Sequence, residues 1–304
     1  MISKLIHQIW FQDNKDIYFF SDNLDNNINR VFSSMIPFQY KLNLIKLLSQ
    51  NKDYSYCLWN QTKIYNLIKL FYPNLLQLYQ KLEYRIQKID FAKYIILYHY
   101  GGIYIDIDVE SKNSLNHFFK IYPMTNLYFS KVSYINDLED KILKKFYNYK
   151  SNNYFVNNGI IIAKRKHPFF KDLLNDLKFN ILNNNDYFYN SKIFNTTGPS
   201  LLTNSILKHL YKYQDIVILD SIYFEPCYGK DPSCKLKNDT ILKHLHKSIW
   251  LENIESDNLI INFIFNSLFS ITGDSIFIIY FYFIRGYKIL YLTILIIIYL
   301  YNKN

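Results

Sequence analysis

The stretch from Tyr100 to Asp108 constrains the fold of this chain more than any other part of it. A segment without glycine or proline, residues 83–100, runs into a double glycine, and a short apolar run then ends in two aspartates. The apolar spacing predicts a helix over 83–100 that Gly101 ends in the left-handed αL conformation. If the following run is a strand, Asp106 and Asp108 project from one face, roughly 7 Å apart along the strand.

Two carboxylates so close repel each other unless a cation lies between them. Hard oxygen ligands suit Mg²⁺ or Mn²⁺, which keep positions open for phosphate oxygens. Asp90 and Lys93 lie three residues apart on the predicted helix, so they share a face and can reach the same ligand. The alternative is a surface ion pair on a core helix beside an edge strand. The combined pattern favours a metal–nucleotide site at Asp106 and Asp108.

The run from Asp90 to Asp108 resembles the sugar-binding region of glycosyltransferase family 32, which includes the yeast initiating α-1,6-mannosyltransferase and the sphingolipid mannosyltransferases. Further segments resemble motifs of the family in the expected order: Ile6–Phe11, Tyr54–Trp59, Asn157–Ala163, Thr197–Pro199 and His246–Trp250. The resemblance implies an α/β fold of the GT-A type, a Rossmann-like mixed sheet flanked by helices that binds a nucleotide sugar.

The same resemblance implies how the donor is bound. The opening strand would contact the base, although Trp10 fits a core position equally well. A carboxylate at Asp90 suits sugar hydroxyls and a cation at Lys93 suits phosphate; relatives carry arginine where this chain has Lys93, so a bidentate contact is lost. The donor-binding residues implied are Ile9, Trp10, Phe11, Asp90, Lys93, Asn158 and Gly159.

The metal site is implied in the same way. Asp106 would meet the ribose and a metal-bound water, and Asp108 would bind the metal directly. His246 is the expected additional ligand. His244 lies one strand period away on the same face and stays open as an alternative.

The implied reaction moves a hexosyl group, with retention at the anomeric carbon, from a UDP- or GDP-sugar to a hydroxyl of a glycan, lipid or protein. Mn²⁺ or Mg²⁺ would neutralise the departing diphosphate while Ser248 and Trp250 donate hydrogen bonds to it. Two alternatives stay open: a nucleotide-sugar hydrolase, and a catalytically inactive, membrane-tethered sugar-nucleotide-binding protein. The presence of Asp106, Asp108, Ser248 and Trp250 argues against an inactive protein.

The formal charge of +10 suits an anionic partner such as a nucleotide diphosphate or an acidic membrane. Nucleic acid is not expected, because the basic residues are dispersed along the chain and form no cluster that would follow a phosphate backbone.

The composition divides the chain into a catalytic domain over 1–265 and a hydrophobic tail over 266–304. Residues 276–301 are nearly all apolar and contain two cations, Arg285 and Lys288. Such a helix could span a membrane, lie in its interface, or pack on the catalytic domain. The expected location is a membrane surface with the catalytic domain in the cytoplasm, because residues 1–14 form no signal peptide; an ER or Golgi membrane is the alternative.

Cys227 and Cys234 flank a turn-rich loop that could close a disulfide, or could bind zinc with His244 and His246. The predicted elements alternate, as expected of a nucleotide-binding α/β domain. Strands are expected near 2–11, 54–59, 103–108, 127–133, 154–163 and 216–219, and helices near 39–50, 61–71, 83–100, 137–147, 168–182 and 199–212.

Overall fold

The computed structural model describes residues 1–11, 19–21, 23–33, 36–132, 154–184, 189–227 and 236–246. These residues belong to one compact unit, Met1–Lys247. The predicted domain over 1–265 is therefore described as far as His246, and the predicted tail over 266–304 lies outside the described residues. Among the helices of the described part, none is long and apolar enough to cross a membrane.

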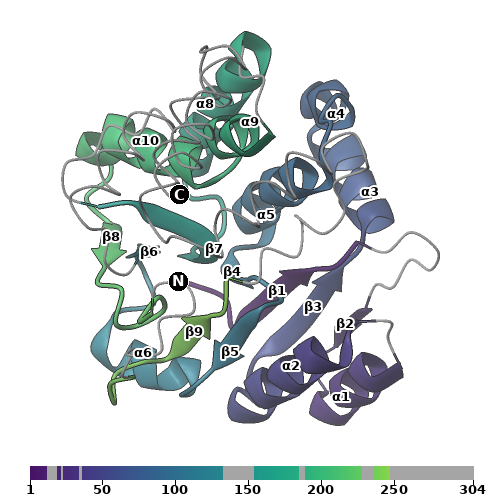
Figure 1. Cartoon of the computed structure of the whole chain (residues 1–304), viewed down its shortest axis with the longest axis vertical. Coiled ribbons are helices and arrows are strands. Elements are labelled where there is room, and N and C mark those ends of the chain that lie inside the picture. Colours follow the sequence, from purple (N-terminus) through teal and green to yellow (C-terminus); the bar gives the residue numbers. More distant parts are fainter. Residues whose placement is uncertain are drawn as a thin grey trace, which may run out of the picture. The chain divides into compact units, whose positions relative to one another are not determined.

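A seven-stranded mixed sheet forms the centre of the described unit (Figure 1). Its strands lie in the order β2 (Phe19–Ser21), β3 (Ser55–Trp59), β1 (Leu5–Ile9), β4 (Gly102–Ile105), β7 (Val156–Ala163), β6 (Leu127–Lys131) and β8 (Ile216–Leu219). β1 is parallel to β3 and β4, and β6 is parallel to β8, whereas β2–β3, β4–β7 and β6–β7 are antiparallel. A separate antiparallel pair joins β5 (Val109–Ser111) to β9 (Leu242–His244). The predicted mixed α/β class is confirmed.

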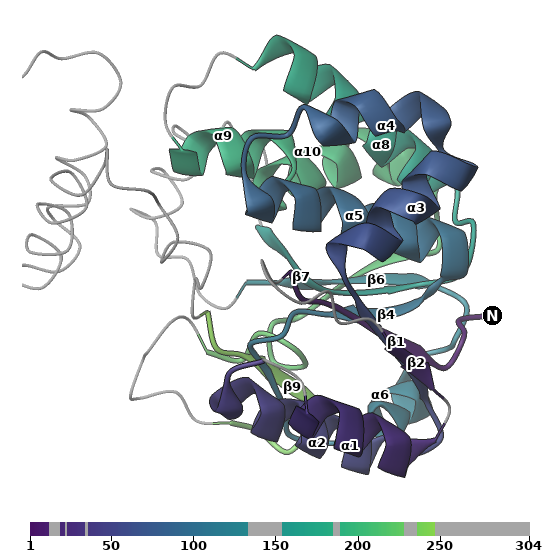
Figure 2. The ribbon, with the colours of Figure 1, turned by 90° about the vertical axis from the view of Figure 1, so that its right-hand side faces the viewer.

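Helices cover both faces of the central sheet (Figure 2). One face carries α3 (Gln61–Phe71), α4 (Pro73–Gln80), α5 (Arg85–Tyr100), α8 (Phe169–Asn183), α9 (Tyr189–Thr196) and α10 (Pro199–His209), which continues as the 3₁₀ helix η1 (Leu210–Lys212). The other face carries α1 (Leu24–Ser33), α2 (Phe38–Gln50) and α6 (Leu115–Ile121), next to the small β5–β9 sheet. The strands thus lie between two helical layers.

The long predicted elements agree with the structure. The helices expected near 39–50, 61–71, 83–100, 168–182 and 199–212 correspond to α2, α3, α5, α8 and α10 with η1. The short elements α1, α4, α6, α9, β2, β5 and β9 were not expected from the sequence. The helix expected near 137–147 lies outside the described residues.

α5 runs through the core, and every residue from Asp90 to His99 is buried. A helix that is covered on all sides carries apolar residues on all faces, so its sequence shows little amphipathic pattern. Asp90 and Lys93 are nevertheless only 3 % and 1 % exposed. Burial of charged groups is costly unless they are paired, so both side chains are expected to have close polar partners.

Two glycines turn the chain sharply from α5 into β4. Gly101 has φ 67° and ψ −162°, a combination that is essentially restricted to glycine and differs from the αL conformation expected there. Gly102 has φ 98°, and a Cβ atom on it would lie 2.4 Å from the carbonyl oxygen of Leu5. A Cβ atom on Gly101 would lie 2.4 Å from the backbone nitrogen of Arg165. The double glycine therefore lets β4 pack directly beside β1.

β4 ends at Ile105, so the expected strand over 103–108 is too long. Residues 106–108 form a turn instead, because the amide of Val109 donates to the carbonyl oxygen of Asp106 at 3.2 Å. Asp106 and Asp108 are therefore brought together by a turn and not by the alternation of a strand.

Candidate active site

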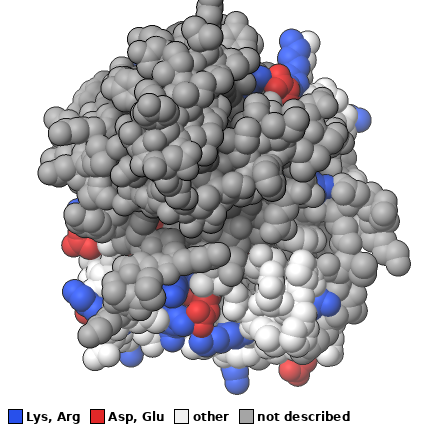
Figure 3. Space-filling view, in the orientation of Figure 1, with Lys and Arg blue, Asp and Glu red and all other residues white. Residues whose placement is uncertain are grey.

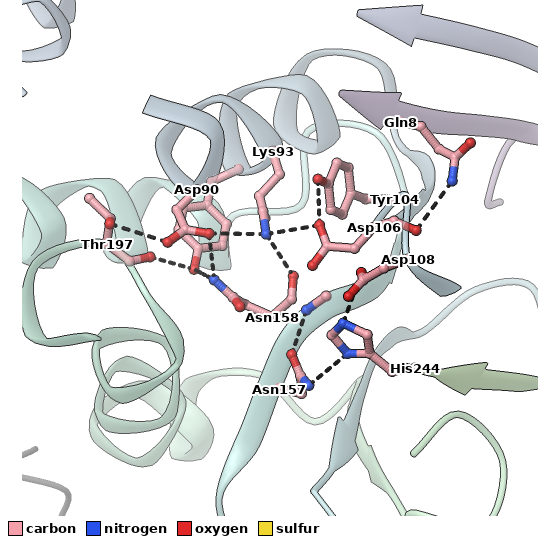
Figure 4. A network of polar contacts seen from close by, with 12 residues as sticks. Gln8, Asp90, Lys93, Tyr104, Asp106, Asp108, Asn157, Asn158, Thr197 and His244 are labelled. Atoms are coloured by element: carbon pink, nitrogen blue, oxygen red, sulfur yellow. Dashed lines mark hydrogen bonds and ion pairs between the residues drawn. The ribbon is translucent and has the colours of Figure 1, made fainter. Parts of the chain in front are cut away.

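Asp106 is fixed where three strands of the central sheet meet (Figure 4). Its amide donates to the carbonyl oxygen of Gly159 on β7 at 2.8 Å. Its own carbonyl oxygen accepts from the side-chain amide of Gln8 on β1 at 3.2 Å. The hydroxyl of Tyr56 on β3 donates to Oε1 of Gln8 at 2.9 Å, which orients that amide. The backbone of the turn therefore has a defined position at the carboxyl end of β4.

Lys93 on α5 is the cation beneath this turn. Its Nζ atom lies 3.4 Å from Oδ1 of Asp106, 3.0 Å from Oδ1 of Asp90 and 3.2 Å from the carbonyl oxygen of Asn158. The hydroxyl of Tyr104 also donates to Oδ1 of Asp106, at 2.7 Å. One buried ammonium group thus connects the helix, the turn and β7.

In the pair of Asp90 and Lys93, burial and the charge of the neighbouring groups shift each pKa in opposite directions. Burial raises the pKa of Asp90 to about 6, although Lys93 pulls that pKa down. Burial alone would lower the pKa of Lys93, but the carboxylates of Asp106 and Asp90 outweigh it and hold the pKa above its usual value. Lys93 is therefore protonated at neutral pH and serves both carboxylates.

Asp90 uses both of its oxygens inside the protein. Oδ1 accepts from the side-chain amide of Asn158 at 2.9 Å, and Oδ2 accepts from the hydroxyl of Thr197 at 3.3 Å. The hydroxyl of Tyr94 donates to the carbonyl oxygen of Thr197 at 2.9 Å. Asp90, Lys93 and Asn158 thus form a buried polar scaffold beneath the aspartate turn.

His244, the last residue of β9, completes the cluster above the scaffold. β9 pairs with β5 so that His244 lies opposite Val109, directly after the aspartate turn. Nε2 of His244 lies 3.1 Å from Oδ1 of Asp108, and the amide of Leu245 donates to the carbonyl oxygen of Asp108 at 3.0 Å. Asp106, Asp108 and His244 can each offer one ligand atom, all within 4.8 Å of one another.

Gly159 leaves room for this arrangement. A Cβ atom on Gly159 would lie 2.7 Å from Cε1 of His244 and 2.8 Å from Oδ2 of Asp106. Real Cβ atoms do not approach other atoms so closely. Because β7 passes under the cluster at Gly159, the imidazole and the carboxylate can share one small volume.

His246 belongs to a neighbouring cluster. β9 ends at His244, and His246 has a positive φ of 48°, so the strand period that would put His244 and His246 on one face does not extend to His246. Nε2 of His246 lies 2.8 Å from Oε2 of Glu225, and Nδ1 of His244 lies 3.0 Å from Oε1 of the same carboxylate. The structure thus places His244, and not His246, with Asp106 and Asp108.

The charges of the two clusters are linked through His244. Burial alone would lower the pKa of His244, but the carboxylates of Glu225 and Asp108 hold it well above its usual value. Burial would raise the pKa of Glu225, but His244 and His246 reverse that shift and lower it. A cation that binds His244 has to displace its proton.

A divalent cation fits the group of Asp106, Asp108 and His244. Two carboxylates balance its charge, an imidazole nitrogen faces the same volume, and Gly159 keeps that volume free of side-chain atoms. Carboxylate ligands suit Mg²⁺ and Mn²⁺, and the added imidazole favours the transition metal of the two. The residues present therefore fit the metal that the sequence predicts.

The three residues expected on the base side differ in exposure. Ile9 and Phe11 are buried members of the main hydrophobic cluster. Trp10 is half-buried, and its ring contacts Tyr40 with centroids 6.5 Å apart. Its Nε1–H is buried and finds no hydrogen-bond acceptor among the described residues. Of the three, Trp10 is the one whose side chain carries a hydrogen-bond donor.

Ser248 and Trp250, which are expected to donate hydrogen bonds to the diphosphate, lie outside the described residues. Cys227 is disulfide-bonded, so its thiolate is not available to zinc, and the metal-competent group around His246 contains Glu225 instead. Nothing in the sequence points to Glu225, whereas Thr197 lies in a segment that resembles a family motif but for which the resemblance implies no particular contact.

Charged side chains on the visible face are interspersed, with Lys and Arg next to Asp and Glu along its lower part (Figure 3). Among the ion pairs of the described residues, Glu110 lies 2.6 Å from Lys112 and 3.4 Å from Lys46, and Lys131 lies 3.0 Å from Asp220. Such partly or fully exposed pairs are typical of a solvated surface.

Several known proteins are similar to this chain. The model of the glycosyltransferase sugar-binding region containing a DXD motif matches residues 37–125. An uncharacterised glycosyltransferase of Acanthamoeba polyphaga mimivirus is 28% identical over 262 residues, which cover 84% of this chain and 86% of that protein. Inositol phosphoceramide mannosyltransferase 1 of Schizosaccharomyces pombe is 27% identical over 76% of this chain but only 59% of its own length. The solved galactosyltransferase LgtC, with donor and acceptor sugar analogues, covers 80% of this chain at 12% identity and a TM-score of 0.41.

Proposed function

We propose that this chain, which belongs with the glycosyltransferases that carry a DXD sugar-binding region, uses a divalent cation to transfer a hexosyl group from a nucleotide-diphosphate sugar to an acceptor hydroxyl. The observation that carries the proposal is the convergence of Asp106, Asp108 and His244 within 4.8 Å, directly above the buried Lys93.

The fold supports a donor site of the GT-A type. β1 and β4 are adjacent and parallel, and Trp10 and Asp106 each follow the carboxyl end of one of them. Ligands of α/β sheets bind outside the carboxyl ends of parallel strands. We therefore place the nucleotide across these two strand ends, with the base toward Trp10 and the diphosphate toward Asp106.

Asp106, Asp108 and His244 would hold Mn²⁺ or Mg²⁺ at the diphosphate. When bound, the cation would stabilise the negative charge that develops on the leaving diphosphate. The chain itself fixes the ligand atoms beforehand: Lys93 and Tyr104 hold Oδ1 of Asp106, and the β5–β9 pair holds His244. Ligands held in place before binding do not have to reorganise during the reaction.

The remaining contacts to the donor are those that the resemblance to the family implies. Asp90, Lys93, Asn158 and Gly159 would line the sugar side, but Asp90 and Lys93 are already paired and buried. In this proposal they act mainly by shaping the site beneath the donor. Ser248 and Trp250 would donate to the diphosphate, and retention at the anomeric carbon follows from the resemblance alone.

The fungal relatives suggest the first substrates to test. Their names specify mannosyl transfer to inositol phosphoceramide. A mannose nucleotide as donor and a phosphoinositol lipid as acceptor would also suit a chain of charge +10. Association with a membrane, including an ER or Golgi membrane, is part of this proposal and rests on the apolar composition of residues 276–301 and on these relatives. Sedimentation with vesicles tests it.

The function is tested by a thermal-shift screen of UDP- and GDP-sugars with Mn²⁺. A donor at 100 times its dissociation constant should add about 2.7 kcal/mol to the free energy of unfolding. The stabilising donor is then incubated with and without acceptor, and transfer is expected only with acceptor. Equal sugar release without acceptor would identify a hydrolase, and no Mn²⁺-dependent stabilisation by any donor would contradict the proposal.

A further inference from the structure

Glu225 is a buried carboxylate that has two histidine partners. Its side chain is fully buried, Oε1 lies 3.0 Å from Nδ1 of His244, and Oε2 lies 2.8 Å from Nε2 of His246. Its amide donates to the carbonyl oxygen of Ser221 at 2.7 Å. The carbonyl oxygen of Tyr223 accepts from the amide of Leu242 at 3.1 Å, which joins this loop to β9. The backbone thus sets the distance between Glu225 and the two imidazoles.

The surroundings of His244 determine where its ring carries hydrogen. Nδ1 faces Oε1 of Glu225, which can only accept, and the side-chain nitrogen of Asn157, which can only donate, each at 3.0 Å. The amide of Asn157 is held in this orientation because its Oδ1 accepts from the amide of Gly159 at 2.7 Å. A bare Nδ1 would place its lone pair against a buried carboxylate, whereas a protonated Nδ1 donates a charge-assisted hydrogen bond to it. Because a charge-assisted hydrogen bond is roughly twice as strong as a neutral one, the contact with Glu225 outweighs the one that Asn157 could donate, and the hydrogen belongs on Nδ1.

We propose that Glu225 is a positioning residue: it accepts the Nδ1 hydrogen of His244 and thereby presents a bare Nε2 to a cation held by Asp106 and Asp108. This inference rests on the proposed function, because the cation is the one invoked there. A carboxylate behind a ligating imidazole fixes the tautomer and the ring orientation and makes the ligand more basic.

His246 restrains Glu225 from the other side. Its ring stacks on that of His244, with centroids 4.1 Å apart and planes at 26°. Its backbone has a positive φ of 48°, which is uncommon for a residue other than glycine. The second oxygen of Glu225 is thereby engaged, so that the carboxylate cannot rotate away from His244. His246 is thus the partner of the positioning residue and lies outside the cation site.

The test is the affinity for Mn²⁺ alone, measured by the EPR signal of the free ion, together with thermal unfolding. Glu225→Met keeps the side-chain volume but removes both acceptors, and it should weaken Mn²⁺ binding about 10–100-fold. Glu225→Gln keeps one acceptor and should lie between the wild-type protein and Glu225→Met; it also serves if Glu225→Met does not fold. Glu110→Met is the matched control, because Glu110 lies on β5 opposite Lys243, while its carboxylate binds Lys112 and Lys46. It should leave Mn²⁺ affinity unchanged.

A double-mutant cycle separates positioning from a general structural effect. In a His244→Ala background, Glu225→Met should cause no further loss of affinity, because its effect passes through His244. Nitrogen-15 shifts of the His244 ring, recorded without metal at a pH high enough to leave the ring neutral, should show hydrogen on Nδ1 in the wild-type protein and a mixture of tautomers in Glu225→Met.

Unchanged Mn²⁺ affinity in folded Glu225→Met, or an equal loss in both backgrounds, would overturn the inference and leave the proposed function intact. Failure of the wild-type protein to bind Mn²⁺ would contradict the proposed function as well.

Discussion

Nε2 of His244 lies 3.1 Å from Oδ1 of Asp108, although 136 residues separate them in the chain. The contact exists because β5 begins directly after the aspartate turn and pairs with β9, which ends in His244. Two strands of three residues each thus connect the DXD turn to the last described segment of the chain.

Asp108→Asn should abolish Mn²⁺ binding and turnover while the protein stays folded. The substitution keeps the size of the side chain but removes one of the two charges that balance a divalent cation. Mn²⁺ titration and thermal unfolding together check this. Asp220→Asn, at an exposed carboxylate paired with Lys131, is the control and should behave like the wild-type protein. Wild-type Mn²⁺ affinity in Asp108→Asn would exclude Asp108 as a ligand.

Lys93→Met should lower the free energy of unfolding by about 3–5 kcal/mol, because it leaves two carboxylates without their buried counter-ion. The pKa of Asp90 is already raised to about 6, so protonation of Asp90 should reduce this loss in acid. Urea unfolding at pH 5 and pH 7.5 measures the difference, and Asp90→Asn in the Lys93→Met background should recover part of the stability. A loss independent of pH would show that the ion pair is not the cause.

Gly159→Ala should weaken Mn²⁺ binding about 10–100-fold, because the added methyl group displaces the His244 ring or the Asp106 carboxylate. Overpacking should also cost about 1–3 kcal/mol of stability. Gly198→Ala is a matched control, since its Cβ would lie 3.0 Å from Cα of Phe194, away from the cation site. Gly198→Ala should lower the stability but leave the affinity for Mn²⁺ unchanged. Equal affinity loss in both variants would mean that overpacking anywhere disturbs the site.

His7 should make stability depend on pH. Burial lowers its pKa from 6.5 to about 4, although the hydrogen bond to Gly101 opposes this. Nδ1 of His7 already accepts a hydrogen bond from Nε1 of Trp59 at 3.1 Å, so the ring has no free nitrogen for a second proton. The folded pKa is the lower one, so the stabilisation is complete above pH 6.5 and is lost as the pH falls toward 4.

The protonation of His7 should lower the free energy of unfolding by about 3 kcal/mol between pH 6.5 and pH 4. Asp90 acts with the opposite sign, because its raised pKa favours the folded state in acid and that benefit is lost as the pH rises through about 6. Unfolding of His7→Gln should therefore be compared with that of the wild-type protein at each pH, and the difference should shrink toward pH 4. A constant difference would exclude His7 as the source.

The local part of the site could be predicted from the sequence. The three-residue spacing of Asp90 and Lys93 predicted that both side chains lie on one face of the helix, because residues three apart in a helix are neighbours. The resemblance to the family, and not the spacing, implied that Asp106 belongs to the same site. The extent of β4 was overestimated. Asp106 and Asp108 favour turns, and the amide of Val109 donates to the carbonyl oxygen of Asp106 and ends the strand there.

The contacts of the site between segments far apart in the chain could not be predicted. His244 and His246 are equivalent by strand alternation, and only the end of β9 at His244 and the positive φ of His246 distinguish them. Glu225 lies in a loop without a motif, and its contact depends on the packing of that loop against β9. Such contacts between short segments leave no periodic pattern in the sequence.

Anomalous X-ray diffraction from crystals grown with Mn²⁺ and a nucleoside diphosphate would show whether Asp106, Asp108 and His244 bind the cation of a glycosyltransferase. One strong anomalous peak is expected within about 2.5 Å of a carboxylate oxygen of Asp108 and of Nε2 of His244, in contact with the diphosphate. A peak between Glu225 and His246, or a bound diphosphate without a peak at Asp108, would contradict it.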